Sequence, residues 1–242
     1  MAAIGLSQCA IWVAHGMLRL GGTAHCDWAA VEPVLDPAAP PPARASEMAA
    51  ESSPAPRGAM AILAFVFAAT WFVTGAMAAH LPRLLEIAGA STTAAIAAAA
   101  LVGPAQVAAR LVEFGALRMA HPLVSARLAA LLHPIGAVIL GLFGTGAITA
   151  FAVLHGAGNG LLTIAKGTVP LAIFGPVGYG LRSGILGAPA RATQAASPLL
   201  FGLLMDYMGI GVIAVSAGLS LSAFAALLLL KARPSSTAPA PA

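Results

Sequence analysis

The sequence predicts an all-helical membrane protein with six transmembrane helices, and three observations support this fold class. Of the 242 residues, 60% are hydrophobic and only 8% are charged, whereas about a quarter of the residues of an ordinary soluble domain are charged. So few charged side chains cannot cover the surface of a soluble protein of this length. From residue 58 onward, apolar stretches recur that match the ~20 residues of a membrane-spanning helix, and polar or Gly-rich breaks separate them.

Residues 1–57 differ from the rest of the chain. Residues 32–56 are rich in Pro, Ala and Ser, a composition typical of linkers, and we expect most of this N-terminal segment to be disordered. Its two cysteines, Cys9 and Cys26, lack the C-x-x-C spacing of metal and redox sites, so we expect no metal or other cofactor. The tail, residues 232–242, is also of low complexity and is expected to be disordered.

The predicted transmembrane domain covers residues 58–231, and its breaks divide it into six helices. Residues 128–165 contain no Asp, Glu, Lys or Arg, and a straight helix of that length would measure about 57 Å, roughly twice the hydrocarbon thickness. The chain must therefore turn back, and the Gly-rich residues 144–147 are the natural turn. The helices are expected at residues 58–82, 87–109, 122–143, 147–174, 183–205 and 212–230.

The distribution of basic residues predicts the orientation of these helices. With six spans, Arg83 falls on one side alone. The other side receives Arg57, Arg118, Arg127, Arg182, Lys231 and Arg233. The positive-inside rule makes the crowded side cytoplasmic, so both termini are expected in the cytoplasm and the protein in the inner (plasma) membrane. The basic residues are scattered singly, so the high pI of about 9.7 predicts no nucleic-acid partner.

Four local strings resemble a known family of carriers. They are WFVTGAMAAHLP at 71–82, LVGPAQVAAR at 101–110, HGAGNG at 155–160 and FGPVGYGLR at 174–182. On these strings, residues 58–231 resemble the C-terminal half of a major facilitator superfamily transporter of the uncharacterised bacterial permease type. The loop signature of that superfamily, a Gly, an acidic residue and paired basic residues, is only echoed by Gly115, Arg118 and Arg127.

This resemblance implies a permease that moves a small solute by alternating access. Such carriers have twelve helices in two halves, with the solute site between the halves, and no first half is visible in this chain. We therefore expect a partner bundle, either a second copy of the chain or a separate N-terminal half. The alternative is a truncated or non-transporting membrane subunit.

The clearest candidate binding residues lie on the fourth predicted helix. His155, Asn159, Thr163 and Lys166 are spaced four, four and three apart, which places them on one helical face. In the functional interpretation, Lys166 attracts an anionic group while His155 and Asn159 form hydrogen bonds with the solute. In the alternative, Lys166 extends its amine to the membrane boundary, and His155 and Asn159 join neighbouring helices.

The other helices carry further candidates. On the second helix, Gln106 is expected to touch the solute, and Arg110 and Glu113, three apart, form either a gating ion pair or a static one. On the fifth helix, Arg191 and Gln194 lie between two prolines that permit a bend, unless Arg191 belongs to the cytoplasmic basic cluster.

On the third predicted helix, His133, which precedes Pro134, is a weaker candidate for binding the solute. Gly156 and Gly160 form a Gly-x-x-x-Gly pair that allows another helix to approach closely.

We expect no enzyme activity, because the sequence contains no G-x-S-x-G turn, no HExxH motif and no paired intramembrane carboxylates. An intramembrane hydrolase built around His155 and Asn159 is the remote alternative.

Overall fold

The computed structural model describes residues 58–117 and 120–230, and this part of the chain is helical without any strand. In chain order its helices are α3 (Ala59–Ile87), α4 (Thr92–Ala100), α5 (Val102–Val112), α6 (Pro122–Phe143), α7 (Ile148–Phe174), α8 (Tyr179–Met208) and α9 (Val212–Leu228). A π-helical turn, Glu113–Leu117, extends α5, and short 3₁₀ turns follow α6 and α8. The predictions for residues 1–57, for Arg118 and for residues 231–242 lie outside the described residues.

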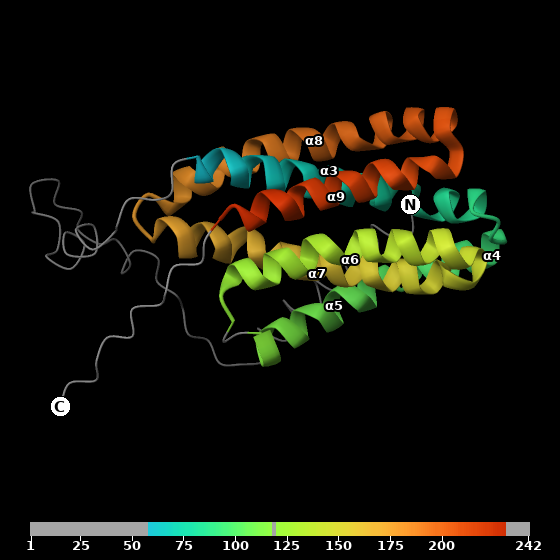
Figure 1. Cartoon of the computed structure of the whole chain (residues 1–242), viewed down its shortest axis with the longest axis horizontal. Coiled ribbons are helices and arrows are strands. Elements are labelled where there is room, and N and C mark those ends of the chain that lie inside the picture. Colours follow the sequence, from blue (N-terminus) through green and yellow to red (C-terminus); the bar gives the residue numbers. More distant parts are fainter. Residues whose placement is uncertain (1–57, 118–119, 231–242) are drawn as a thin grey trace, which may run out of the picture. The chain divides into compact units, whose positions relative to one another are not determined.

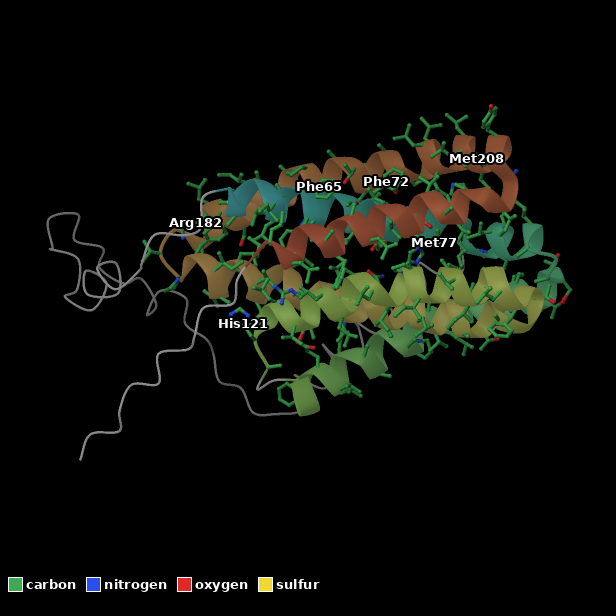
Figure 2. The ribbon with its side chains drawn as sticks, viewed as in Figure 1. Phe65, Phe72, Met77, His121, Arg182 and Met208 are labelled. Atoms are coloured by element: carbon green, nitrogen blue, oxygen red, sulfur yellow. The ribbon has the colours of Figure 1, made fainter. Side chains whose placement is uncertain are left out.

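Four continuous helical stretches are long and apolar enough to cross a membrane. They are residues 59–87, 92–115, 122–174 and 179–228. Their length and composition confirm the all-helical architecture of a membrane protein. Large apolar side chains on the outside fit this environment: Phe65, labelled in Figure 2, is 45% exposed, and Leu142 is 74% exposed.

Local sequence explains where the helices start and where they reverse. The Ser91 side chain accepts a hydrogen bond from the amide of Ala94 and so caps α4. Within the two longest stretches the chain reverses at Gly144 and Gly209, each with φ +56° and ψ near −135°. Glycine adopts this backbone region without steric strain, because it has no Cβ. As a result α7 runs back along α6, and α9 returns along α6 and α3 (Figure 1).

The helices pair in a pattern that repeats between the first three segments and the last three. We call α3, α4–α5 and α6 the first repeat, and α7, α8 and α9 the second repeat. The first segment of each repeat packs on the second segment of the other, α3 on α8 and α7 on α5. Likewise α6 packs on α7, α9 packs on α3, and α6 packs on α9. Exchanging the two repeats leaves this pattern unchanged.

The two repeats run in opposite directions. The start of α3 shares an apolar cluster with the end of α7, around Phe67 and Val169, and the end of α3 shares another with the start of α7, around Leu84 and Phe151. The first segments of the two repeats are therefore antiparallel. In this contact pattern the two repeats are inverted relative to each other, and the middle of the bundle lies between the two apolar clusters.

Candidate functional site

Polar side chains gather halfway along the helices, between the two apolar clusters. They come from four helices and both repeats. The set, which we call the central cluster, comprises Thr70, Thr74, His133, His155, Asn159, Ser216 and Ser220. A polar group buried among apolar side chains is costly unless it is hydrogen-bonded, so the bonds within the central cluster determine its arrangement.

Two histidines from neighbouring helices form the core of the cluster. The Nδ1 atoms of His133 on α6 and His155 on α7 are 3.1 Å apart, and His133 Nε2 lies 3.0 Å from Ser216 Oγ on α9. The two rings meet edge to face with centroids 5.1 Å apart. Phe151 stacks on His155, with ring centroids 6.4 Å apart. This chain of contacts ties α7, α6 and α9 together at mid-depth.

A second contact joins α3 and α7, the first helices of the two repeats. Thr74 Oγ1 on α3 lies 3.0 Å from Asn159 Oδ1 on α7 and 3.0 Å from the Thr70 carbonyl oxygen. The Asn159 carbonyl accepts a hydrogen bond from Thr163, at 2.9 Å. Asn159 therefore lies at the interface between the repeats and is held by both its side chain and its backbone.

A cavity of about 250 Å³ opens beside the central cluster. It is lined by Thr74, Met77, Ala78, Leu81 and Pro82 of α3, by Ala99, Val102 and Gln106 of α4–α5, and by His155 and Asn159 of α7. Its polar lining side chains are one hydroxyl, two amides and one imidazole, and none of the lining residues is an acid or a basic Lys or Arg. A smaller hollow of about 20 Å³, large enough for one water, lies beside His133 and Ser220.

Close helix crossings flank the cavity at equivalent places in the two repeats. A Cβ on Gly75 of α3 would lie 2.9 Å from the Gln194 carbonyl oxygen of α8. A Cβ on Gly160 of α7 would lie 2.5 Å from the Gln106 carbonyl oxygen of α5. Each glycine directly follows a residue of the bond between the repeats, Thr74 or Asn159. Glycine is required at both positions because backbone atoms of the partner helix occupy the space of a side chain.

The predicted residues of α7 divide into two groups. His155 and Asn159 line the cavity, whereas Lys166 does not. The Lys166 ammonium lies 4.0 Å from the centre of the Trp71 ring of α3, a cation–π contact. It is close enough to Arg191 of α8 for the two positive charges to repel each other. Arg191 is exposed and Gln194 half-buried, and neither lines the 250 Å³ cavity.

The candidate gating residues are not ion-paired with each other. Arg110 reaches α7 instead and donates a hydrogen bond of 3.4 Å to Thr163. Glu113 is 9% exposed and begins the π-helical turn. Within the described residues the ion pair is Arg83–Asp206, 2.7 Å, which links α3 to α8.

Sequence reasoning missed the hydroxyl groups of the central cluster. Thr74 and Ser216 lie in apolar stretches, and such side chains commonly bond to the carbonyl three or four residues earlier in their own helix. No group of three or more His, Cys, Asp and Glu side chains that could hold a metal ion occurs within residues 58–117 and 120–230.

No protein-family model matches this sequence, and a search of curated proteins gives no significant match.

Proposed function

We propose that this protein is a multi-pass carrier that moves a small solute by alternating access. The observation that carries the proposal is the cavity beside the central cluster, where four polar side chains line an otherwise apolar wall and Thr74 and Asn159 join α3 and α7, the first helices of the two repeats. Secondary transporters typically bind their solutes near the bilayer midplane at the interface between such repeats. Intramembrane polar residues are costly, and they commonly mark solute pathways.

The proposed topology has six spans, with both termini in the cytoplasm and the protein in the inner membrane. Two of the continuous apolar stretches contain 53 and 50 residues, and a straight helix of that length would measure about 75–80 Å, more than twice the hydrocarbon thickness. The reversals at Gly144 and Gly209 divide each stretch into two helices of ordinary length. Arg182 lies toward one end of the bundle and Met208, just before α9 begins, toward the other (Figure 2). Arg127 donates hydrogen bonds to the Leu227 and Leu230 carbonyls at the opposite end of α9, so Arg127 and Arg182 share the proposed cytoplasmic end.

The chain resembles the C-terminal half of a major facilitator carrier, and the helix pairing supports this relation. Each half of such a carrier contains two inverted repeats of three helices, which is the pattern in which α3–α6 and α7–α9 pair. In such a carrier the solute site is shared with a second bundle, and we propose that this bundle covers the open side of the cavity. Another copy of the chain or a separate N-terminal half would supply it. Light scattering of the detergent-solubilised protein, corrected for bound detergent, distinguishes a dimer from a monomer that lacks this partner.

Site-directed labelling tests the six-span topology. Replacing Cys9 and Cys26 by Ser gives a background without cysteine, into which Thr145→Cys, Val177→Cys and Tyr207→Cys are introduced singly. All three side chains are exposed and lie between helices or at a helix end. In intact cells a membrane-impermeant maleimide should label Cys at 145 and 207 but label Cys at 177 only after the cells are opened. Labelling of all three from one side would rule out the six-span arrangement.

A second pair of cysteines tests alternating access without knowledge of the solute. Gln106 lines the cavity, whereas its neighbour Val107 is 54% exposed and turned away from the lining. A small hydrophilic thiol reagent should reach Gln106→Cys from either side of oriented vesicles, because an alternating cavity opens to each face in turn. Val107→Cys, the matched control, should react from neither. Reaction of Gln106→Cys from one side only would contradict alternating access.

A further inference from the structure

The hydrogen bonds of the central cluster determine where its protons lie. Ser216 Oγ is 2.9 Å from the Ile213 carbonyl oxygen and 3.0 Å from His133 Nε2. A carbonyl oxygen can only accept, so the single hydroxyl proton of Ser216 points at Ile213. His133 Nε2 must then carry the proton of its own contact with Ser216. A neutral imidazole has one protonated nitrogen, so His133 Nδ1 is an acceptor.

The same reasoning extends to His155. Its Nδ1 lies 3.1 Å from His133 Nδ1, and because that atom has no proton, His155 Nδ1 must supply one. His155 Nε2 is then unprotonated. This nitrogen makes no hydrogen bond within the described part of the chain, and the His155 ring borders the 250 Å³ cavity.

The surroundings keep both imidazoles uncharged. The titratable group that faces each ring is the other ring, and both rings are 5% exposed. The acids of the described residues, Glu86, Glu113 and Asp206, lie toward the helix ends and make no contact with the pair. A buried imidazolium without an acidic partner is unfavourable. Only one arrangement of protons satisfies all three contacts of the neutral pair.

We propose that His155 Nε2 is a fixed hydrogen-bond acceptor in the cavity, which therefore takes an uncharged solute that donates a hydrogen bond. The lining has no acid, Lys or Arg to neutralise an ionic solute, and the amides of Gln106 and Asn159 add neutral polar partners. The volume suits a small molecule, since a cavity of roughly 150 Å³ accommodates benzene. The choice of solute rests on the proposed carrier function, whereas the proton arrangement does not.

Ser216 is a positioning residue in this arrangement, because it acts on the cavity through His133. Without the Ser216 hydroxyl, the His133 Nε2 proton would have no acceptor in an apolar surrounding. Moving that proton to Nδ1 restores a bond to His155 Nδ1, and His155 must then carry its proton on Nε2. Ser216→Ala therefore converts the acceptor in the cavity into a donor, although Ser216 does not line that cavity.

Nitrogen-15 NMR of the full chain, labelled at histidine and held in lipid nanodiscs, tests the proton arrangement. Unprotonated ring nitrogens resonate well downfield of protonated ones, and His133→Gln and His155→Gln assign the signals. We expect an unprotonated His155 Nε2 in the native chain and a protonated one in Ser216→Ala. Ser222→Ala is the matched control, because Ser222 lies on the same helix and bonds to the Leu219 carbonyl at 2.8 Å but is outside the central cluster; it should leave the signals unchanged. A protonated Nε2 in the native chain, or no change in Ser216→Ala, would overturn the proposal.

Three small probes of similar size test the solute class. Acetamide donates a hydrogen bond, N,N-dimethylacetamide cannot, and acetate is an anion. Acetamide alone should shift the His155 Nε2 signal of the native chain, and this preference should disappear in Ser216→Ala. Equal shifts with dimethylacetamide or acetate would refute the selection of a donor. This result is separable from the carrier function, because the cysteine at position 106 can fail to alternate while the acetamide shift persists.

Discussion

Adding one methyl group at Gly160 should separate two helices of the bundle. A Cβ at this position would lie 2.5 Å from the Gln106 carbonyl oxygen, 3.0 Å from its Cα and 3.1 Å from its carbonyl carbon. Ordinary contact begins near 3.4 Å, so the shortfall at the oxygen is about 0.9 Å. All three opposing atoms belong to the backbone of α5. No rotamer change can relieve the contact, and α5 and α7 must therefore move apart.

The size of the effect follows from the nature of the opposing atoms. Overpacking a well-packed core costs roughly 1–3 kcal/mol, and a clash with backbone belongs in the upper part of that range. We expect Gly160→Ala to lower the free energy of unfolding by about 2–3 kcal/mol, which is roughly a 30- to 150-fold change in the equilibrium constant. Gly218 of α9 is the matched control, because a Cβ there meets no atom within 4 Å. Gly218→Ala should leave stability unchanged or raise it slightly, since alanine favours the helix.

The assay is unfolding by sodium dodecyl sulfate in mixed micelles, followed by far-ultraviolet circular dichroism. Both variants are compared with the native chain under the same lipid and detergent conditions. Gly160→Ala should shift the midpoint to a lower mole fraction of the denaturing detergent, and Gly218→Ala should not. Equal midpoints for the two alanine variants would refute the close approach of α5 and α7.

Two further predictions concern the charged residues. The 4.0 Å contact between Lys166 and Trp71 should give a coupling energy of about 0.5–2 kcal/mol in a double-mutant cycle of Lys166→Met and Trp71→Leu. The cycle is measured by the same unfolding assay, and additive effects of the two single substitutions would contradict the contact. The Arg83–Asp206 pair is more than half exposed on both sides, so Asp206→Asn should change stability by less than about 1 kcal/mol, and the change should shrink as salt is added; a larger effect that persists in high salt would indicate a buried role for the pair.

Composition is sufficient to predict an all-helical architecture with long apolar helices, because it acts locally. Lipid exposure requires an apolar exterior, and a glycine can reverse a chain wherever the neighbouring residues permit it. Gly144 is predicted as a turn on these grounds, and in the structure it has a positive φ of +56°. His155 and Asn159 were placed on one face by their spacing of four, and both line the cavity. Local spacing therefore identified which side chains share a face.

Long-range partners could not be predicted in the same way. Nothing near Ser216 in the sequence indicates that it bonds to His133, 83 residues earlier. Lys166 shares the helical stripe of His155, yet the sequence does not reveal that its ammonium lies against the Trp71 ring and outside the cavity lining. Helix spacing determines which face a residue occupies, whereas the neighbouring helix determines what that face meets.

The two repeats place the same physical features on either side of the cavity. In each, a polar residue that bonds across the repeat interface precedes a glycine that lets a partner helix approach, Thr74 with Gly75 and Asn159 with Gly160. These crossings hold α3 to α8 and α7 to α5 far more extensively than α3 contacts α7. A movement that separates the two helix pairs would therefore break the Thr74–Asn159 contact and leave both crossings intact. The cavity lies at the weakest of these three interfaces, and if α6 moves with α7 and α9 with α3, the α6–α9 packing with its His133–Ser216 bond is the other link that such a rigid-body movement would have to break.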